Sequence, residues 1–102
     1  MLEIRPSCEH CNKDLPADSP EACICSYECT FCRDCVDTVL ENVCPNCGGG
    51  FSARPIRPER EWRAGLSRAI QVPASERTLK PVDRTEHKLF AAPIKTVLPV
   101  NR

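Results

Sequence analysis

The sequence predicts a small α+β domain held together by bound metal and followed by a proline-rich, basic tail. Nine cysteines lie in the first 47 residues of the 102-residue chain, and none follows them. Four Cys-x-x-Cys pairs recur among these cysteines, and each pair can place two thiolates on one metal ion. The apolar residues of this half are too few for a large core, so a domain of its size needs metal, disulfides or a partner to fold.

Zinc explains these cysteines better than disulfide bonds do. The opening Met1–Pro6 contains no apolar signal-peptide core, and no run approaches the roughly 18 apolar residues that would span a membrane. We therefore expect a cytoplasmic protein, in which thiols stay reduced and paired cysteines bind zinc. An odd number of cysteines also fits a closed set of disulfides poorly.

The head, which we define as residues 1–52, is expected to contain two knuckles, tight turns that each carry a Cys-x-x-Cys pair. In chain order we expect a knuckle, a short hairpin, a helix and a second knuckle, at residues 6–16, 22–31, 32–42 and 44–47. The helix is predicted because apolar residues recur at spacings of three and four, namely Val36, Val39, Leu40 and Val43.

Eight of the nine cysteines can be shared between two four-cysteine sites. Omitting Cys23 leaves the spacing C-x2-C-x13-C-x3-C-x2-C-x2-C-x8-C-x2-C, which resembles the cross-brace of RING-type and treble-clef zinc domains. In a cross-brace, successive ligand pairs alternate between the two metals. One zinc ion would be bound by Cys8, Cys11, Cys32 and Cys35. The other zinc ion would be bound by Cys25, Cys29, Cys44 and Cys47.

The first of these sites also has a physical logic, because a helical turn holds Cys32 and Cys35 on one face. Sequential pairing is the alternative. It would leave five cysteines for one metal and assign the other metal to Cys8, Cys11, Cys23 and Cys25.

Several motifs of the head extend this pattern beyond the ligand spacing. They are the opening Met1–Pro6, Asp14-Leu-Pro-Ala, the segment Ile24–Cys32, and the knuckles Cys-Glu-His-Cys and Cys-Pro-Asn-Cys-Gly-Gly. Together they resemble a family of small bacterial cysteine-rich proteins known as domain of unknown function 1272, over about residues 1–58. The resemblance implies a RING-like or zinc-ribbon fold in a bacterial cytoplasm. It implies no activity, and the tail lies outside it.

The tail, residues 53–102, differs from the head in charge and composition. Residues 51–102 carry eleven basic and five acidic residues, a net charge of +6, whereas residues 1–50 carry three and nine, a net charge of −6. Six prolines limit helices in the tail to short pieces. We expect one helix at about 58–72, with an apolar stripe, and a shorter one after Asp83, which forms an Asp-x-x-Glu capping pattern with Glu86. The remainder is expected to be extended or partly disordered.

A non-enzymatic zinc-binding module that contacts another protein is the leading hypothesis for function. Closed four-cysteine sites leave no open position for water or a small-molecule substrate. The basic tail would lie along its own acidic head or along that of a protein partner, anchored by Trp62, Leu66 and Ile70. His10 is expected to be a solvated polar residue, and His87 has no evident partner in the sequence.

Two other functions stay open. The tail arginines could make the protein a nucleic-acid-binding zinc-ribbon accessory protein, although an acidic head repels phosphate. Cys23 could act as the thiol of a zinc or redox sensor, or it could be a surface or half-buried cysteine at a variable hairpin position. Ubiquitin-ligase work is disfavoured, because the first knuckle lacks an apolar residue and residues 33–43 contain no tryptophan. We expect no membrane partner.

Overall fold

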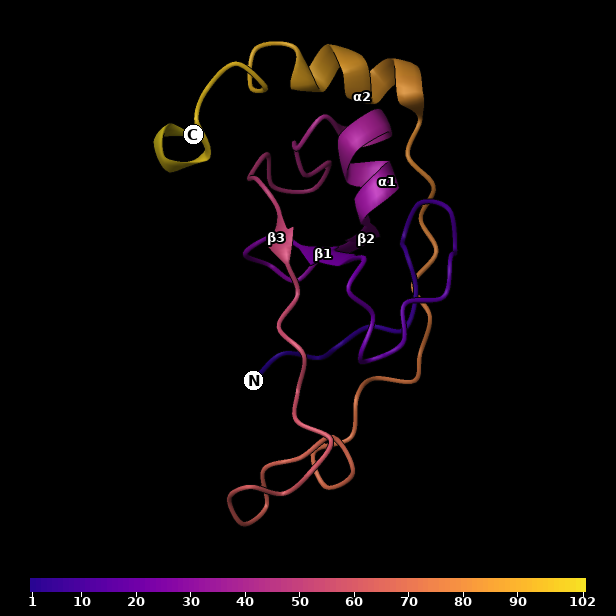
Figure 1. Cartoon of the computed structure of the whole chain (residues 1–102). Coiled ribbons are helices and arrows are strands. Elements are labelled where there is room, and N and C mark those ends of the chain that lie inside the picture. Colours follow the sequence, from indigo (N-terminus) through magenta and orange to yellow (C-terminus); the bar gives the residue numbers. More distant parts are fainter.

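The computed structural model describes all 102 residues, which form an elongated molecule of 46 × 27 × 17 Å. The head lies in the middle of the molecule, the tail helix α2 (Arg84–Ala91) lies at one end, and a long loop of the tail projects from the other end (Figure 1). The fold is therefore a small α+β head that the tail follows along its length.

A three-stranded antiparallel sheet lies at the centre of the head. The middle strand β1 (Ala22–Ile24) pairs with β2 (Thr30–Cys32) on one side and with β3 (Ser52–Ala53) on the other. The β1–β2 pair confirms the hairpin expected from the sequence. The third strand was not expected, and it brings the start of the tail into the head.

The head helix begins where the hairpin ends, as the sequence predicts. Helix α1 (Arg33–Cys35) continues directly into a π-helical turn, η1 (Val36–Leu40). The helix stops because Glu41 and Asn42 adopt left-handed backbone conformations, with φ of 52° and 58°. Left-handed residues other than glycine are uncommon, and two in succession turn the chain sharply into the second knuckle.

Thiols make up much of the core. Twelve buried residues form one apolar cluster, and seven of them are cysteines. Phe31 and Leu15 are its largest side chains, and Phe51 packs edge-on against Phe31 with ring centroids 5.5 Å apart. Few aliphatic side chains are buried, so this core is small for a domain that folds without metal, disulfides or a partner.

The helix expected at 58–72 is wrong. These residues form turns and extended chain. Gly65 takes a left-handed φ of 79°, and its N–H is bonded to the carboxylate of Glu61, which closes a turn rather than continuing a helix. Trp62 and Leu66 are 74% and 58% exposed. With no surface to cover, an apolar stripe cannot stabilise so short a helix, so Trp62 does not anchor the tail.

The second expected helix forms where its capping pattern predicts it. The Asp83 carboxylate caps α2 by accepting the N–H of Glu86 at 2.9 Å. His87 and Ala91 are buried on the inner face of α2, which lies beside the head helix (Figure 1).

Hydrogen bonds and ion pairs tie the tail to the head. Backbone N–H groups of Ala74 and Lys80 donate to the carbonyls of Glu3 and Glu9 at 2.8 and 2.7 Å. Arg77 pairs with Asp14 at 2.7 Å, and Lys95 pairs with Glu41 at 3.3 Å. The tail thus lies along its own acidic head, as the charge difference predicts. None of the helices combines the length and the apolar character needed to cross a membrane.

Candidate metal centres

Four cysteines of the head bring their sulfur atoms together at one point. The Sγ atoms of Cys8, Cys11, Cys32 and Cys35 all lie within 4.8 Å of one another, and those of Cys11 and Cys32 are 3.8 Å apart. Sulfurs bound at about 2.3 Å to a tetrahedral zinc ion would lie about 3.8 Å from each other. The arrangement is therefore close to that of a four-thiolate metal site.

Local backbone structure positions each sulfur of this quartet. In the first knuckle, the N–H of Cys8 donates to the carbonyl of Lys13 at 2.9 Å, and the N–H of Asn12 donates to the carbonyl of Cys8 at 3.0 Å. Asn12 closes the turn in a left-handed conformation, with φ of 65°. Opposite the knuckle, Cys32 is the N-cap of α1 and Cys35 ends it, so both thiols lie on one helical face.

Thiols packed so closely cannot all ionise without a cation. Burial raises the pKa of the Cys35 thiol, and the neighbouring thiols of Cys32 and Cys8 raise it further. Burial also works to raise the pKa of Cys8, but the N–H groups of Cys11, Cys32 and His10 outweigh it and lower that pKa. Backbone dipoles thus favour a thiolate at one corner of the quartet, and a divalent cation would favour thiolates at the others.

A second group of sulfurs comes from the turn after β1 and from the second knuckle. The Sγ atoms of Cys25, Cys44 and Cys47 lie within 4.8 Å of one another. The N–H of Tyr27 donates to the sulfur of Cys25 at 3.3 Å, and the N–H of Gly49 donates to that of Cys47 at 3.4 Å. Such bonds from the residue two positions later orient thiolates toward a shared ligand.

Cys29, the remaining predicted ligand, is not part of this mutually close group. Its sulfur accepts a hydrogen bond from Asn46 Nδ2 at 3.4 Å. Burial raises the pKa of Cys29, Asn46 lowers it, and the adjacent thiol of Cys25 raises it. Cys29 therefore lies beside the second group, and its role as the fourth ligand stays a prediction.

The two groups alternate along the chain. Cys25 of the second group falls between the Cys8–Cys11 pair and the Cys32–Cys35 pair of the first. Sequential pairing would require the sulfurs of Cys8, Cys11, Cys23 and Cys25 to meet. They do not meet, because Cys25 belongs to the second group and Cys23 belongs to neither group.

Cys23 is fully buried, whereas a surface or half-buried position was expected. It lies in the middle of β1, opposite Phe31 and Ala53, and none of its surface is exposed. Its thiol points toward the carbonyl of Glu21 at 3.8 Å, and burial raises its pKa. A buried thiol with a raised pKa is poorly reactive, which is consistent with a packing role.

Both histidines join the tail to the head, which the sequence did not indicate. His10 is half-buried rather than fully solvated, and its Nδ1 accepts the N–H of Val82 at 2.9 Å. Burial and the charge of Arg84 lower the pKa of His10. His87 is buried, and its Nε2 lies 3.0 Å from the carbonyl oxygen of Leu40.

Two charged residues important to the first knuckle were also missed. The Glu9 carboxylate is buried, accepts the N–H of Thr30 and pairs with Arg5 at 3.0 Å. Arg54 is 5% exposed and donates to three carbonyls that flank the knuckle, those of Arg5, Leu15 and Pro16. Sequence spacing does not reveal these roles, because the Glu9–Thr30 bond and all three Arg54 bonds join residues far apart in the chain.

The fold and site define a small cysteine-rich α+β protein with two groups of thiols that could hold metal ions. The chain belongs to the family described as protein of unknown function (DUF1272), which matches residues 1–57. It is similar to an uncharacterised protein of Rhizobium meliloti (strain 1021), with 50% identity over 74 residues, 70% of this chain and 88% of that relative. No solved structure matches the chain.

Proposed function

We propose that this protein is a non-enzymatic module built on two structural zinc ions and used for protein–protein contact. The observation that carries the zinc proposal is the quartet of Cys8, Cys11, Cys32 and Cys35, interleaved along the chain with Cys25, Cys44 and Cys47. This interleaving supports a RING-like, treble-clef cross-brace, in which each metal ties together segments that are distant in sequence.

Zinc fits these donors better than other common metal ions. Soft thiolates favour zinc over magnesium and calcium, which prefer oxygen ligands. The d electrons of zinc impose no geometry of their own, so zinc accepts a tetrahedral shell of four sulfurs. Bound zinc would act as a structural cross-link and stabilise the thiolate form of every ligand. A closed shell offers no site for activated water, which supports the non-enzymatic assignment.

We assign Cys29 as the fourth ligand of the second zinc ion. Cys29 follows Cys25 by four residues on the turn between β1 and β2, and the pKa of its thiol responds to Cys25 and Cys44. A zinc ion with only three thiolates would keep an open position and a net negative charge. A small movement of the Cys29 side chain from Asn46 would complete the shell.

The exposed loop of the tail supports the contact function. We call residues 57–72 the Trp62 loop. Arg57 closes its base by donating to the carbonyls of Gln71 and, at 2.6 Å, of Leu2. Trp62, Leu66, Ile70 and Val72 are all exposed on it. Several large apolar side chains on one pinned loop are typical of a surface that a partner covers.

The two other functions are supported less well. Five of the eight tail arginines, namely Arg54, Arg57, Arg68, Arg77 and Arg102, are engaged with the protein's own carbonyls or carboxylates, so three are left free for phosphate. The buried Cys23 is poorly placed to act as a sensor.

Native mass spectrometry of the zinc-loaded chain tests the metal proposal. We expect two zinc ions in the wild type, one ion in Cys35→Ser and in Cys44→Ser, and two in the matched control Cys23→Ser. A wild type with one ion or none would contradict the proposal. A photoreactive residue at position 62, used in the native host, tests the contact function: discrete protein adducts are expected, whereas adducts with nucleic acid would support the alternative.

A further inference from the structure

The Trp62 loop has a complementary surface on the same molecule, at the opposite end. We propose that the protein forms an antiparallel dimer in which the Trp62 loop of each copy docks into the pocket beside α2 of the other copy. This inference rests on the contact function proposed above and names the partner as a second copy of the chain.

The loop presents apolar side chains together with positive charge. Its four arginines and two glutamates give it a net charge of +2. Arg60 and Arg63 flank Trp62 in sequence and form no ion pair in the structure. Tryptophan and arginine are both among the residues enriched at the energetic centres of protein interfaces.

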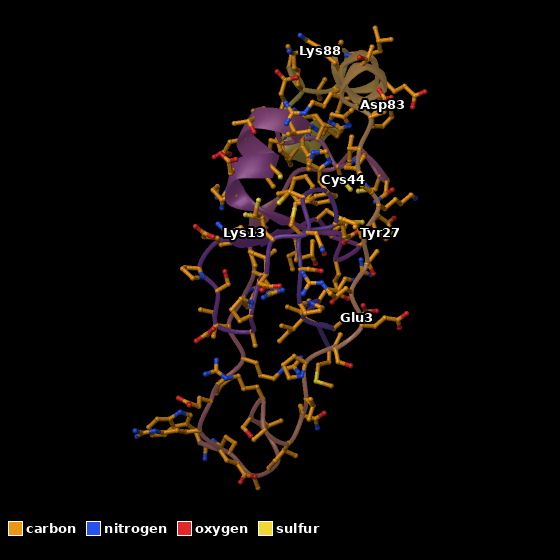
Figure 2. The ribbon with its side chains drawn as sticks, turned by 90° about the vertical axis from the view of Figure 1, so that its right-hand side faces the viewer. Glu3, Lys13, Tyr27, Cys44, Asp83 and Lys88 are labelled. Atoms are coloured by element: carbon orange, nitrogen blue, oxygen red, sulfur yellow. The ribbon has the colours of Figure 1, made fainter.

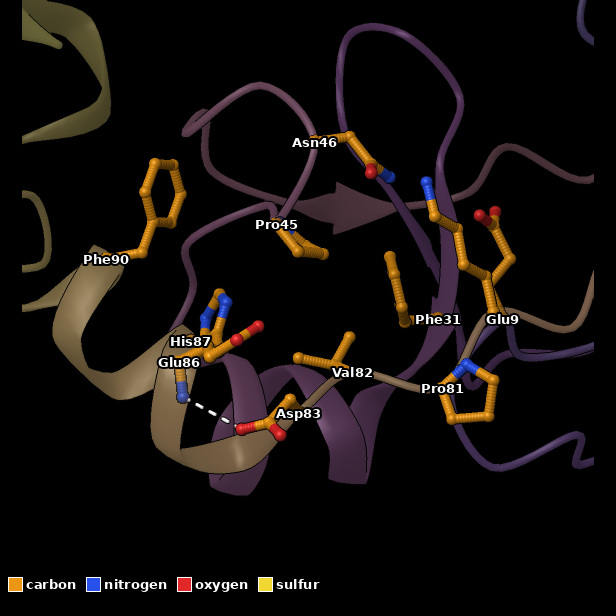
Figure 3. Close-up of a pocket in the computed structure, with 11 residues that line it drawn as sticks. Glu9, Phe31, Pro45, Asn46, Pro81, Val82, Asp83, Glu86, His87 and Phe90 are labelled. Atoms are coloured by element: carbon orange, nitrogen blue, oxygen red, sulfur yellow. Dashed lines mark hydrogen bonds between the residues drawn. The ribbon is translucent and has the colours of Figure 1, made fainter.

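The pocket offers apolar walls and carboxylates. It encloses about 300 Å³ between the second knuckle and α2. Figure 3 shows Phe31, Pro45 and Phe90 on its walls, with Asp83 and Glu86 at the N-terminal end of α2. Glu86 forms no ion pair, and Lys80 is the one lysine or arginine in the lining. Such a pocket suits one large aromatic or guanidinium side chain.

The loop cannot reach this pocket in its own molecule. Figure 1 shows the loop at one end of the molecule and α2 at the other, and Figure 2 shows Asp83 and Lys88 at the end away from the loop. Arg57 holds the base of the loop to Leu2 and Gln71, so the loop cannot fold back along the head. The two surfaces can therefore meet only between copies.

Charge favours the same arrangement. Residues outside the Trp62 loop carry a net charge of −2, because the whole chain is neutral. Each four-thiolate zinc site would add two further negative charges, which makes the remainder about −6. Screening limits the attraction between the loop and this acidic remainder to about 8 Å at physiological salt, so the docked loop would be attracted chiefly by Asp83 and Glu86 at the pocket, against Lys80 in its lining and Arg84 and Lys88 on α2.

A two-fold axis perpendicular to the long axis of the molecule would let both surfaces form contacts at once. It places each loop against the partner's pocket and forms two equal contacts. Closed two-fold dimers are the commonest protein oligomers, whereas a single loop–pocket contact repeated head to tail would give open chains.

Sedimentation velocity of the full-length, zinc-loaded protein over a range of concentrations tests the dimer. We expect a monomer–dimer equilibrium, weakened by salt, and about a tenfold or greater loss of affinity in Trp62→Ser and in Glu86→Lys. The matched controls Leu98→Ser and Glu76→Lys change exposed residues outside both surfaces and should dimerise like the wild type.

Mixing the two variants gives the sharpest result. A Trp62→Ser chain keeps its pocket, and a Glu86→Lys chain keeps its loop, so the mixture retains one intact contact and should associate better than either variant alone. If Glu86→Lys dimerises normally while Trp62→Ser does not, the contact is loop to loop and the proposal is wrong.

Two further outcomes would overturn the dimer while leaving the zinc module intact. One is a monomer at every concentration that still carries two zinc ions by mass spectrometry. The other is a monomer whose Trp62 fluorescence shifts to the blue on phosphatidylglycerol-containing vesicles, which would assign the loop to a membrane surface. Loss of zinc from the wild type would instead show a failure of the proposed function itself.

Discussion

The Nε2 atom of His87 in α2 and the carbonyl oxygen of Leu40 at the end of η1 lie 3.0 Å apart in a buried contact. A carbonyl can only accept, so Nε2 carries the proton. The last carbonyls of a helix have no partner within it. The Leu40 carbonyl accepts the N–H of Val43 at 3.0 Å, and His87 adds a second donor from the other end of the chain. Tail docking and termination of the head helix are therefore coupled through this pair.

Replacing His87 with alanine should release α2 from the head. The change removes one of the two donors to the buried Leu40 carbonyl, which still accepts the N–H of Val43, at a cost of about 0.5–1.5 kcal/mol in the free energy of unfolding. Urea unfolding of the zinc-loaded protein measures this cost, and hydrogen exchange should show faster exchange of α2 amides. The neighbouring exposed Lys88 provides the control Lys88→Ala, which should leave both unchanged. Equal stability of the two variants would rule out the coupling.

Arg54→Ala should be among the most destabilising single changes in the chain. Three carbonyls lose the guanidinium donor at once, and of these the Pro16 carbonyl keeps another donor, the N–H of Ser19. Removal of the buried guanidinium also leaves a cavity beside Leu15. We expect a loss of about 3 kcal/mol or more, a large part of the stability of so small a domain. Arg60→Ala, in the exposed loop, is the control. Thermal unfolding with zinc present makes the comparison, and similar midpoints would contradict the role of Arg54.

Oxidative release of zinc should not depend on Cys23. Its thiol is buried and burial raises its pKa, whereas Cys11 and Cys47 are the exposed cysteines of the two groups. Oxidation is therefore expected to begin at those ligands. Stopped-flow measurement of zinc release by peroxide, with a colorimetric chelator, should give equal rates for wild type and Cys23→Ala. A much slower release from Cys23→Ala would revive the sensor hypothesis.

Arg57→Ala should open the base of the Trp62 loop without unfolding the head. Arg57 donates to Gln71 and Leu2 but to no residue of either cysteine group. Limited trypsin digestion should cut after Arg60 and Arg63 several times faster in the variant, while zinc content stays at the wild-type level. Unchanged cleavage would show that other contacts, such as the bond from Arg68 N–H to the Pro58 carbonyl, are enough to hold the loop.

Sequence spacing predicted much of the head because its structure is local. The Cys-x-x-Cys turns, the β1–β2 hairpin and the helix after Cys32 all depend on contacts between near neighbours. Asp83 and Glu86 predicted the start of α2 for the same reason, since a cap joins residues three apart. Of the two predicted four-cysteine sets, the structure brings together all the sulfurs of Cys8, Cys11, Cys32 and Cys35. The helical and knuckle spacings of these residues fix the directions of their side chains.

Long-range contacts explain what spacing did not predict. β3 is two residues long and shows no alternating pattern. His10, Arg54 and His87 act on partners 72, 49 and 47 residues away at the farthest. The stripe containing Trp62 had the period of a helix but no surface to cover, and a helical period alone does not form a helix.

X-ray absorption spectroscopy at the zinc edge, on protein with a measured metal content, tests the central claim most directly. We expect two zinc ions per chain and an average shell of four sulfurs at about 2.3 Å, with no lighter atom. Substitution of Cys29 by serine should lower the average sulfur number, whereas Cys23→Ser should not. A wild-type shell containing nitrogen or oxygen at about 2.0–2.1 Å, or a single zinc ion per chain, would contradict two closed four-cysteine sites.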